Sequence, residues 1–94
     1  MEDKIILTDN GKKVLDYMQK KDEEMGNTFV GKDIGDNLQM KGIYPVLNSL
    51  VNRGLVCRKE PVVRDFTNLK GVTQPKEYKT YGLTTAGRNF FIEM

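Results

Sequence analysis

The sequence of 94 residues has no histidine and only one cysteine. Zinc sites in proteins are built from several histidine or cysteine ligands, so these absences argue against a structural or catalytic zinc. The lack of histidine also removes the usual general base and the Ser-His-Asp arrangement. No pair of carboxylates lies in an apolar setting that would tune its pKa for acid-base work. We therefore expect a protein that is not an enzyme and that uses neither a metal nor a cofactor.

Long apolar runs are also missing. No stretch approaches the roughly 20 residues that a membrane-spanning helix needs. The first residues, Met-Glu-Asp-Lys-Ile-Ile-Leu-Thr, are too short and too acidic for a signal peptide. The hydrophobic fraction of 38% and the charged fraction of 30% are typical of a globular domain. These features predict one cytoplasmic domain that spans residues 1–94 and makes no membrane contact.

Charge is distributed unevenly, although the formal net charge is only +2. Residues 1–40 contain six basic and nine acidic side chains, whereas residues 41–94 contain nine basic and four acidic ones. This asymmetry favours a polyanion as the partner of the C-terminal half. The alternative interpretation is a solvated surface on which the charges happen to be sorted.

Residues 41–60 form the segment around which the rest of the chain is arranged, and a helix is expected within it at 43–53. The apolar side chains of residues 43–53 recur every three or four positions, which predicts an amphipathic helix with one buried face. These side chains are Ile43, Val46, Leu47, Leu50 and Val51. Gly54 provides a stop signal for the helix, and Leu55-Val56-Cys57 follows as an apolar strand.

Three other helices are expected. Thr8 or Asp9 can cap a helix over residues 9–20, which is followed by a charged loop at 20–27. The segment 28–30 is either a minimal strand or the start of a second helix, which ends at a turn over residues 39–42. The spacing of this helix, the turn and the helix at 43–53 matches a helix-turn-helix. Thr84 or Thr85 can cap a last helix over residues 85–93.

Two strands are expected at residues 55–59 and 78–83, with a long loop at about 60–77 between them. Pro61 and Pro75 bracket this loop, and Asn68–Gly71 is its turn-like centre. The apolar side chains of Val62, Val63 and Phe66 can extend the first strand toward that turn.

Two linked patterns carry a resemblance to a known family. Leu47-x-x-Leu50-x-x-x-Gly54-Leu55-Val56 is followed by Tyr81-x-Leu83-Thr84-x-x-Gly87. The region from Thr28 to Phe91 resembles winged helix-turn-helix proteins, most closely small MarR-like bacterial or phage regulators. The resemblance implies an α+β fold with a three-helix core, a β-hairpin wing and a C-terminal helix. It also implies DNA binding in the regulation of transcription.

In such a protein the helix at 43–53 enters the major groove of double-stranded DNA, and the basic wing at 55–83 contacts phosphates. Polar side chains on the outward face of that helix are the candidates for contacts with base edges: Tyr44, Asn48, Ser49 and Asn52. Basic side chains on the wing and near the two helices are the candidates for phosphate contacts: Lys32, Lys41, Arg58, Lys59, Arg64, Lys70, Lys76 and Lys79.

The outward face differs from the family pattern. Gly42, Tyr44 and Pro45 stand where the family usually has Ser, Thr and Arg, and no basic side chain precedes Arg53 on this face. An alternative function is therefore a winged-helix module that binds another protein and has little or no sequence-specific affinity for DNA. The apolar Phe90-Phe91-Ile92 exceeds what one face of a short helix can bury, which suggests a homodimer formed through the terminal helices.

Overall fold

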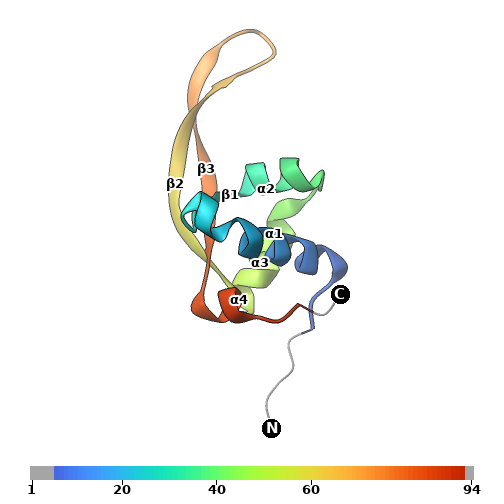
Figure 1. The fold of residues 1–94 in the computed structure, drawn as a ribbon. Helices are drawn as coiled ribbons and strands as arrows, with labels where there is room; N and C mark the ends of the chain where they lie inside the picture. Colours follow the sequence, from blue (N-terminus) through green and yellow to red (C-terminus); the bar gives the residue numbers. More distant parts are fainter. Residues whose placement is uncertain (1–5, 93–94) are drawn as a thin grey trace.

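The computed structural model describes residues 6–92, and within them the chain forms four helices and three strands (Figure 1). In chain order these are α1 (Asp9–Met25), β1 (Phe29–Val30), α2 (Gly31–Leu38), α3 (Ile43–Asn52), β2 (Val56–Thr67), β3 (Thr73–Leu83) and α4 (Thr85–Asn89). The strands make one antiparallel sheet in the order β1-β3-β2. The α+β class expected from the sequence is confirmed at this level.

Helix α1 begins as predicted. The Thr8 hydroxyl caps it by accepting a hydrogen bond of 3.1 Å from the Gly11 amide, which would otherwise lack a partner in the first turn. The buried side of the helix carries Val14, Leu15 and Met18 at helical spacing. These side chains pack into a core with residues of the other elements, chiefly Phe29, Ile34, Leu47, Leu50, Leu55 and Tyr81.

The end of α1 differs from the prediction, because the expected loop at 20–27 is helical as far as Met25. Ion pairs three and four residues apart support this charged turn, as Lys21 pairs with Glu24 at 3.3 Å. Asp22 also pairs with Arg88 of α4 at 2.9 Å. The helix stops at Gly26, whose φ of 61° is the left-handed conformation that glycine adopts readily.

Helices α2 and α3 pack closely at Gly35. A Cβ atom at this position would lie 3.2 Å from Cγ2 of Ile43, so a larger residue would push the two helices apart. Helix α3 buries Ile43, Leu47 and Leu50, as the apolar spacing predicts. The two helices and the turn at 39–42 between them therefore form one packed unit.

The segment 28–30 contributes a minimal strand, one of the two alternatives that the sequence left open. In β1, Phe29 pairs with Tyr81 and Val30 pairs with Thr80 of β3. The side chain of Asn27 extends this edge, because it donates to the carbonyl of Leu83 at 3.1 Å and accepts from its amide at 2.7 Å.

The prediction of a loop at 60–77 is wrong, because most of these residues form two paired strands. Strand β2 continues to Thr67 and β3 begins at Thr73, so only the turn around Asn68–Gly71 remains. Both prolines fit because they lie where the ladder does not require an amide donor: Pro61 falls in a register shift and Pro75 lies on the part of β3 that β1 does not reach. The resulting hairpin projects well beyond the helices (Figure 1).

Helix α4 is shorter than the predicted 85–93, since it ends at Asn89. The Thr84 hydroxyl caps it by accepting from the Gly87 amide at 3.0 Å. Phe90 has an extended backbone, and the side-chain amide of Gln19 donates to its carbonyl at 2.8 Å. Phe90 and Ile92 pack against the core from an extended segment, so their burial does not require the helix to continue. Phe91 is exposed. Residue 93 lies outside the described residues.

None of the helices in the described part of the chain has the length and apolar character that crossing a membrane requires.

Candidate nucleic-acid interface

The outward face of α3 is polar, as expected. Tyr44 and Asn48, one helical turn apart, are half-buried, whereas Pro45, Ser49 and Asn52 are exposed. The ring of Tyr44 is close to Gly31, where an added Cβ would lie 2.9 Å from its Cε1 atom. Packing therefore fixes the position of Tyr44 and leaves Ser49 and Asn52 accessible to a partner.

Two cations from the base of the hairpin lie against this face of α3. Nη2 of Arg58 donates to Oδ1 of Asn48 at 3.1 Å. Nζ of Lys79 lies 5.6 Å from the centroid of the Tyr44 ring, within the range of a cation–π contact. The fold thus places one positive group of β2 and one of β3 beside the side chains that could read base edges.

The strand residue opposite Arg58 is Tyr81, which belongs to the core. Burial raises the pKa of the Tyr81 phenol above its ordinary value, while the charge of Arg58 acts in the opposite direction. The phenol is therefore neutral at ordinary pH, and the Arg58 charge is not neutralised by it.

A hollow of about 250 Å³ lies at the same place. Its lining residues are Arg58, Lys59, Pro61, Lys79, Thr80 and Tyr81. It adjoins the register shift in the hairpin, where Glu60 and Pro61 fall between the pairs Lys59–Thr80 and Val62–Tyr78. Three of the six lining side chains are basic and none is acidic, so the hollow suits an anionic group such as a phosphate.

Beyond the register shift, the hairpin continues over residues 62–78, which we call the arm. Residues opposite each other in an antiparallel ladder share a face, so the register divides the arm into two faces. The Tyr78 face carries Val62, Arg64, Phe66, Gln74, Lys76 and Tyr78. The Glu77 face carries Val63, Asp65, Thr67, Thr73, Pro75 and Glu77. The first face has two cations and no acid, and the second has two acids and no cation.

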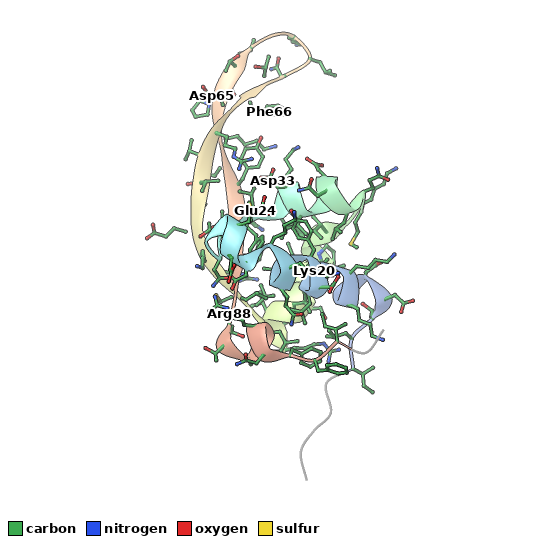
Figure 2. The ribbon with its side chains drawn as sticks, in the orientation of Figure 1. Lys20, Glu24, Asp33, Asp65, Phe66 and Arg88 are labelled. Carbon is green, nitrogen blue, oxygen red and sulfur yellow. The ribbon has the colours of Figure 1, made fainter. Side chains whose placement is uncertain are left out.

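The cations of the Tyr78 face are already engaged within the protein. Both terminal nitrogens of Arg64 donate to the carboxylate of Asp33 at 3.1 Å, and this bidentate pair raises the pKa of the guanidinium. Nζ of Lys76 lies 4.7 Å from the ring centroid of Phe66 and 5.5 Å from that of Tyr78. Figure 2 shows Asp65 and Phe66 on the arm, with Asp33 below them on α2.

The predicted phosphate-binding residues therefore fall into different environments. Arg58 and Lys79 lie beside α3, whereas Lys32 is paired with Asp36 at 2.8 Å, and this pair raises the pKa of Lys32. The other three predicted residues pair with no acidic side chain among residues 6–92, and they differ in exposure. Lys41 and Lys70 are exposed in turns, and Lys59 is half-buried with its methylenes against Gly82.

Sequence reasoning missed two residues that shape this region. Asp33 holds Arg64 from 31 positions away, and local spacing gives no signal for such a pair. Pro61 lines the hollow, although the sequence suggested only that it marks the start of a loop. Reading alternate residues along an extended strand from Val62 to Phe66 would have separated the two faces of the arm.

Among residues 6–92, no three histidine, cysteine, aspartate or glutamate side chains are grouped so that they could hold a metal ion. No model of a known protein family matches the sequence, and neither does any curated protein.

Proposed function

We propose that the protein binds double-stranded DNA as a small winged helix-turn-helix regulator of transcription of the MarR-like kind. One observation carries the proposal: Arg58 and Lys79, from the two strands of the hairpin, lie directly beside Tyr44 and Asn48 on the outward face of α3. In this arrangement α3 lies in the major groove and the base of the hairpin binds the adjacent phosphates.

The order of the elements supports the proposal. A helix, a minimal strand and the α2–α3 pair precede a two-stranded hairpin, and a short helix closes the chain. This order is compatible with a winged-helix layout, in which the hairpin would serve as the wing. In this proposal the long antiparallel arm is an extended form of the wing.

Each side chain beside α3 has a chemical role in this proposal. The oxygen of the Asn48 amide accepts from Arg58, which leaves its NH₂ group pointing away as a donor for a base acceptor. Bidentate recognition of adenine needs both ends of the amide, so the Asn48 oxygen would accept from the adenine amino group through its second lone pair or in exchange for Arg58. Ser49 and Asn52 are exposed on the same helix and supply further donors and acceptors.

The phosphate contacts come first from Arg58, Lys79 and the hollow between them. Lys41, at the turn before α3, and Lys59, at the edge of the hollow, extend the basic surface. Arg64 and Lys32 contribute only if phosphate displaces their carboxylate partners. We therefore expect fewer phosphate contacts than the number of basic side chains in the sequence suggests.

The direct test is the affinity for a fluorescein-labelled duplex of random sequence, measured by anisotropy over a series of salt concentrations. Binding through phosphates displaces counterions, so the logarithm of the affinity falls linearly with the logarithm of the salt concentration, by about 0.9 per phosphate neutralised. Failure to bind the duplex even at low salt would overturn the proposal.

A second function, binding to another protein without specific DNA binding, is favoured by the pairing of Arg64 with Asp33 and of Lys32 with Asp36. These pairs remove two cations from the surface that would face DNA, and Asp65 and Glu77 add negative charge on the arm. This function predicts that charge reversal at Arg58 leaves partner binding intact, whereas the DNA-binding function predicts loss.

We also propose that two copies associate through their terminal segments. Phe91 and Ile6 are the side chains that suit this role, because they are 83% and 71% exposed. Burial of both in a dimer would remove apolar surface from water. Sedimentation of the wild-type protein and of Phe91→Lys tests this: the wild type should form a dimer, and the variant should remain a monomer. A wild-type protein that stays monomeric at high concentration would contradict it.

A further inference from the structure

The end of the arm is an ordered turn that exposes a leucine. Oδ1 of Asn68 accepts from the amides of Lys70 at 2.9 Å and of Val72 at 3.1 Å. The amide of Asn68 also donates to the carbonyl of Val72 at 3.0 Å. Gly71 closes the turn with a φ of 81°. The amides of Asn68, Lys70 and Val72 are thus bonded within the turn, and the side chain of Leu69 is left fully exposed.

The exposed leucine does not stabilise the fold, because it makes no contact with the core. Phe66 and Val72, close to it along the chain, are 42% and 47% exposed. An apolar group held at the end of a projecting arm is the kind of surface that a binding partner covers. The other side chains of the tip indicate the chemistry of that partner.

The composition of the tip favours DNA as the partner. Residues 66–76 contain Lys70 and Lys76 and no acidic side chain. Their other polar side chains are those of Thr67, Asn68, Thr73 and Gln74. Lysine, asparagine and glutamine are the side chains with which minor-groove proteins contact A·T-rich DNA, and such proteins often insert an apolar side chain between base pairs.

The shape of the molecule lets the tip reach a groove that α3 does not occupy. The molecule measures 55 × 23 × 22 Å, and the arm forms its long axis (Figure 1). Asp65 and Glu77 share one face of the arm, so that face is expected to turn away from the phosphates. The tip and the Tyr78 face are then directed toward the DNA.

We propose that the tip of the arm enters the minor groove and that Leu69 inserts between two base pairs as a wedge, which bends the duplex. This inference rests on the proposed DNA binding by α3 and adds a second, separate contact. Lys70 binds the phosphate beside the wedge. Partial unstacking of the base step is offset by removal of the leucine from water and by the longer contact with the bent DNA.

The experiment uses a duplex of about 30 base pairs, which is much shorter than the persistence length of roughly 150 base pairs and is therefore nearly straight alone. A donor and an acceptor dye on its two ends report bending by energy transfer, and 2-aminopurine at a central TA step reports unstacking. A second duplex carries a central A-tract, which is stiffer. Affinity is measured on the same samples by anisotropy.

Wild-type protein should raise the energy transfer and the 2-aminopurine fluorescence, and should do so more with the TA duplex than with the A-tract. Leu69→Ala should abolish both changes while the protein still binds the duplex through α3. Val63→Ala is the matched control, because Val63 is an exposed apolar residue on the shaft of the arm, and it should behave as wild type. Both positions are exposed, so both variants should keep the thermal midpoint of the wild type.

The outcomes separate this inference from the function on which it rests. Binding without any bend, or a bend that Leu69→Ala leaves unchanged, overturns the wedge and leaves DNA binding by α3 intact. The absence of any duplex binding overturns both. Loss of the bend in Leu69→Ala but not in Val63→Ala supports the wedge.

Discussion

The helical body and the arm are stabilised by different forces. In the body, Val14, Leu15, Met18 and Leu47 are fully buried in one apolar core. In the arm, most side chains are exposed. Its strands are joined by backbone pairing and cation–π contacts, and an ion pair holds the arm to α2. The apolar residues of the body therefore account for its folding, whereas those at the tip of the arm do not. The proposed contact with DNA would give these tip residues a role.

The largest expected effect is on the free energy of unfolding, which should depend on the core of the body and very little on the arm. Leu47→Ala should lower the free energy of unfolding by about 2–5 kcal/mol, because it leaves a cavity in the core. Val63→Ala removes an exposed apolar group of the arm and should change it by no more than about 0.5 kcal/mol. Urea unfolding followed by circular dichroism measures both. A large loss in Val63→Ala would mean that the arm helps to hold the body together.

The next effect concerns the point at which body and arm meet. Arg58→Glu should lower the affinity for random duplex DNA by roughly tenfold or more and reduce the salt slope by about 1, because a phosphate contact becomes a repulsion. Lys13→Glu, an equal charge change at an exposed position of α1, should have a much smaller effect. Anisotropy titrations at two salt concentrations measure both variants. Equal losses would assign the affinity to net charge alone.

A smaller effect tests how α4 is attached to the body. Thr84→Ala removes the hydroxyl that accepts from the Gly87 amide and donates to the carbonyl of Gly54 at 2.6 Å. The loss should be about 1 kcal/mol of unfolding free energy, typical of a helix cap. The neighbouring Thr85→Ala serves as the control and should cost less. If the two variants are equally stable in thermal unfolding, the cap has no energetic importance.

The smallest effect appears only at alkaline pH. Burial raises the pKa of Tyr81 in the folded state above its ordinary value of 10.0. The folded protein then holds this proton more tightly than the unfolded chain, so stability is retained below pH 10.0 and falls as the pH rises above it. Tyr81→Phe should make unfolding less sensitive to alkali over this range. Identical alkaline profiles for the two proteins would show that the phenol makes no contribution.

The body was largely predictable because its helices follow a periodic pattern of burial. The start of α1 at Thr8, the buried stripe of α3 and the cap of α4 at Thr84 could each be inferred from nearby residues. The two helix ends that were predicted wrongly depend on distant partners. Asp22, in the last turns of α1, pairs with Arg88 of α4. Phe90, which follows α4, accepts a hydrogen bond from Gln19 of α1.

The arm was less predictable for the same reason. Its strands have little burial to impose a periodic pattern, so residues 60–77 resembled a loop between two prolines. Pairs such as Arg64–Asp33 and Lys76–Phe66 join positions whose proximity depends on the register of the hairpin or the packing of α2. The residue types of the candidate site could be predicted from the sequence. It could not be predicted that Arg58 and Lys79 lie beside α3, whereas Arg64 and Lys76 lie on the arm and are engaged there.

The most direct test of the account is a titration of ¹⁵N-labelled protein with duplex DNA, followed by the chemical shifts of the backbone amides. DNA binding through α3 and the base of the hairpin predicts the largest shifts at Tyr44, Asn48, Arg58 and Lys79, with little change on the exposed side of α1. Shifts that cluster on α1, or no shifts at low salt, would contradict it.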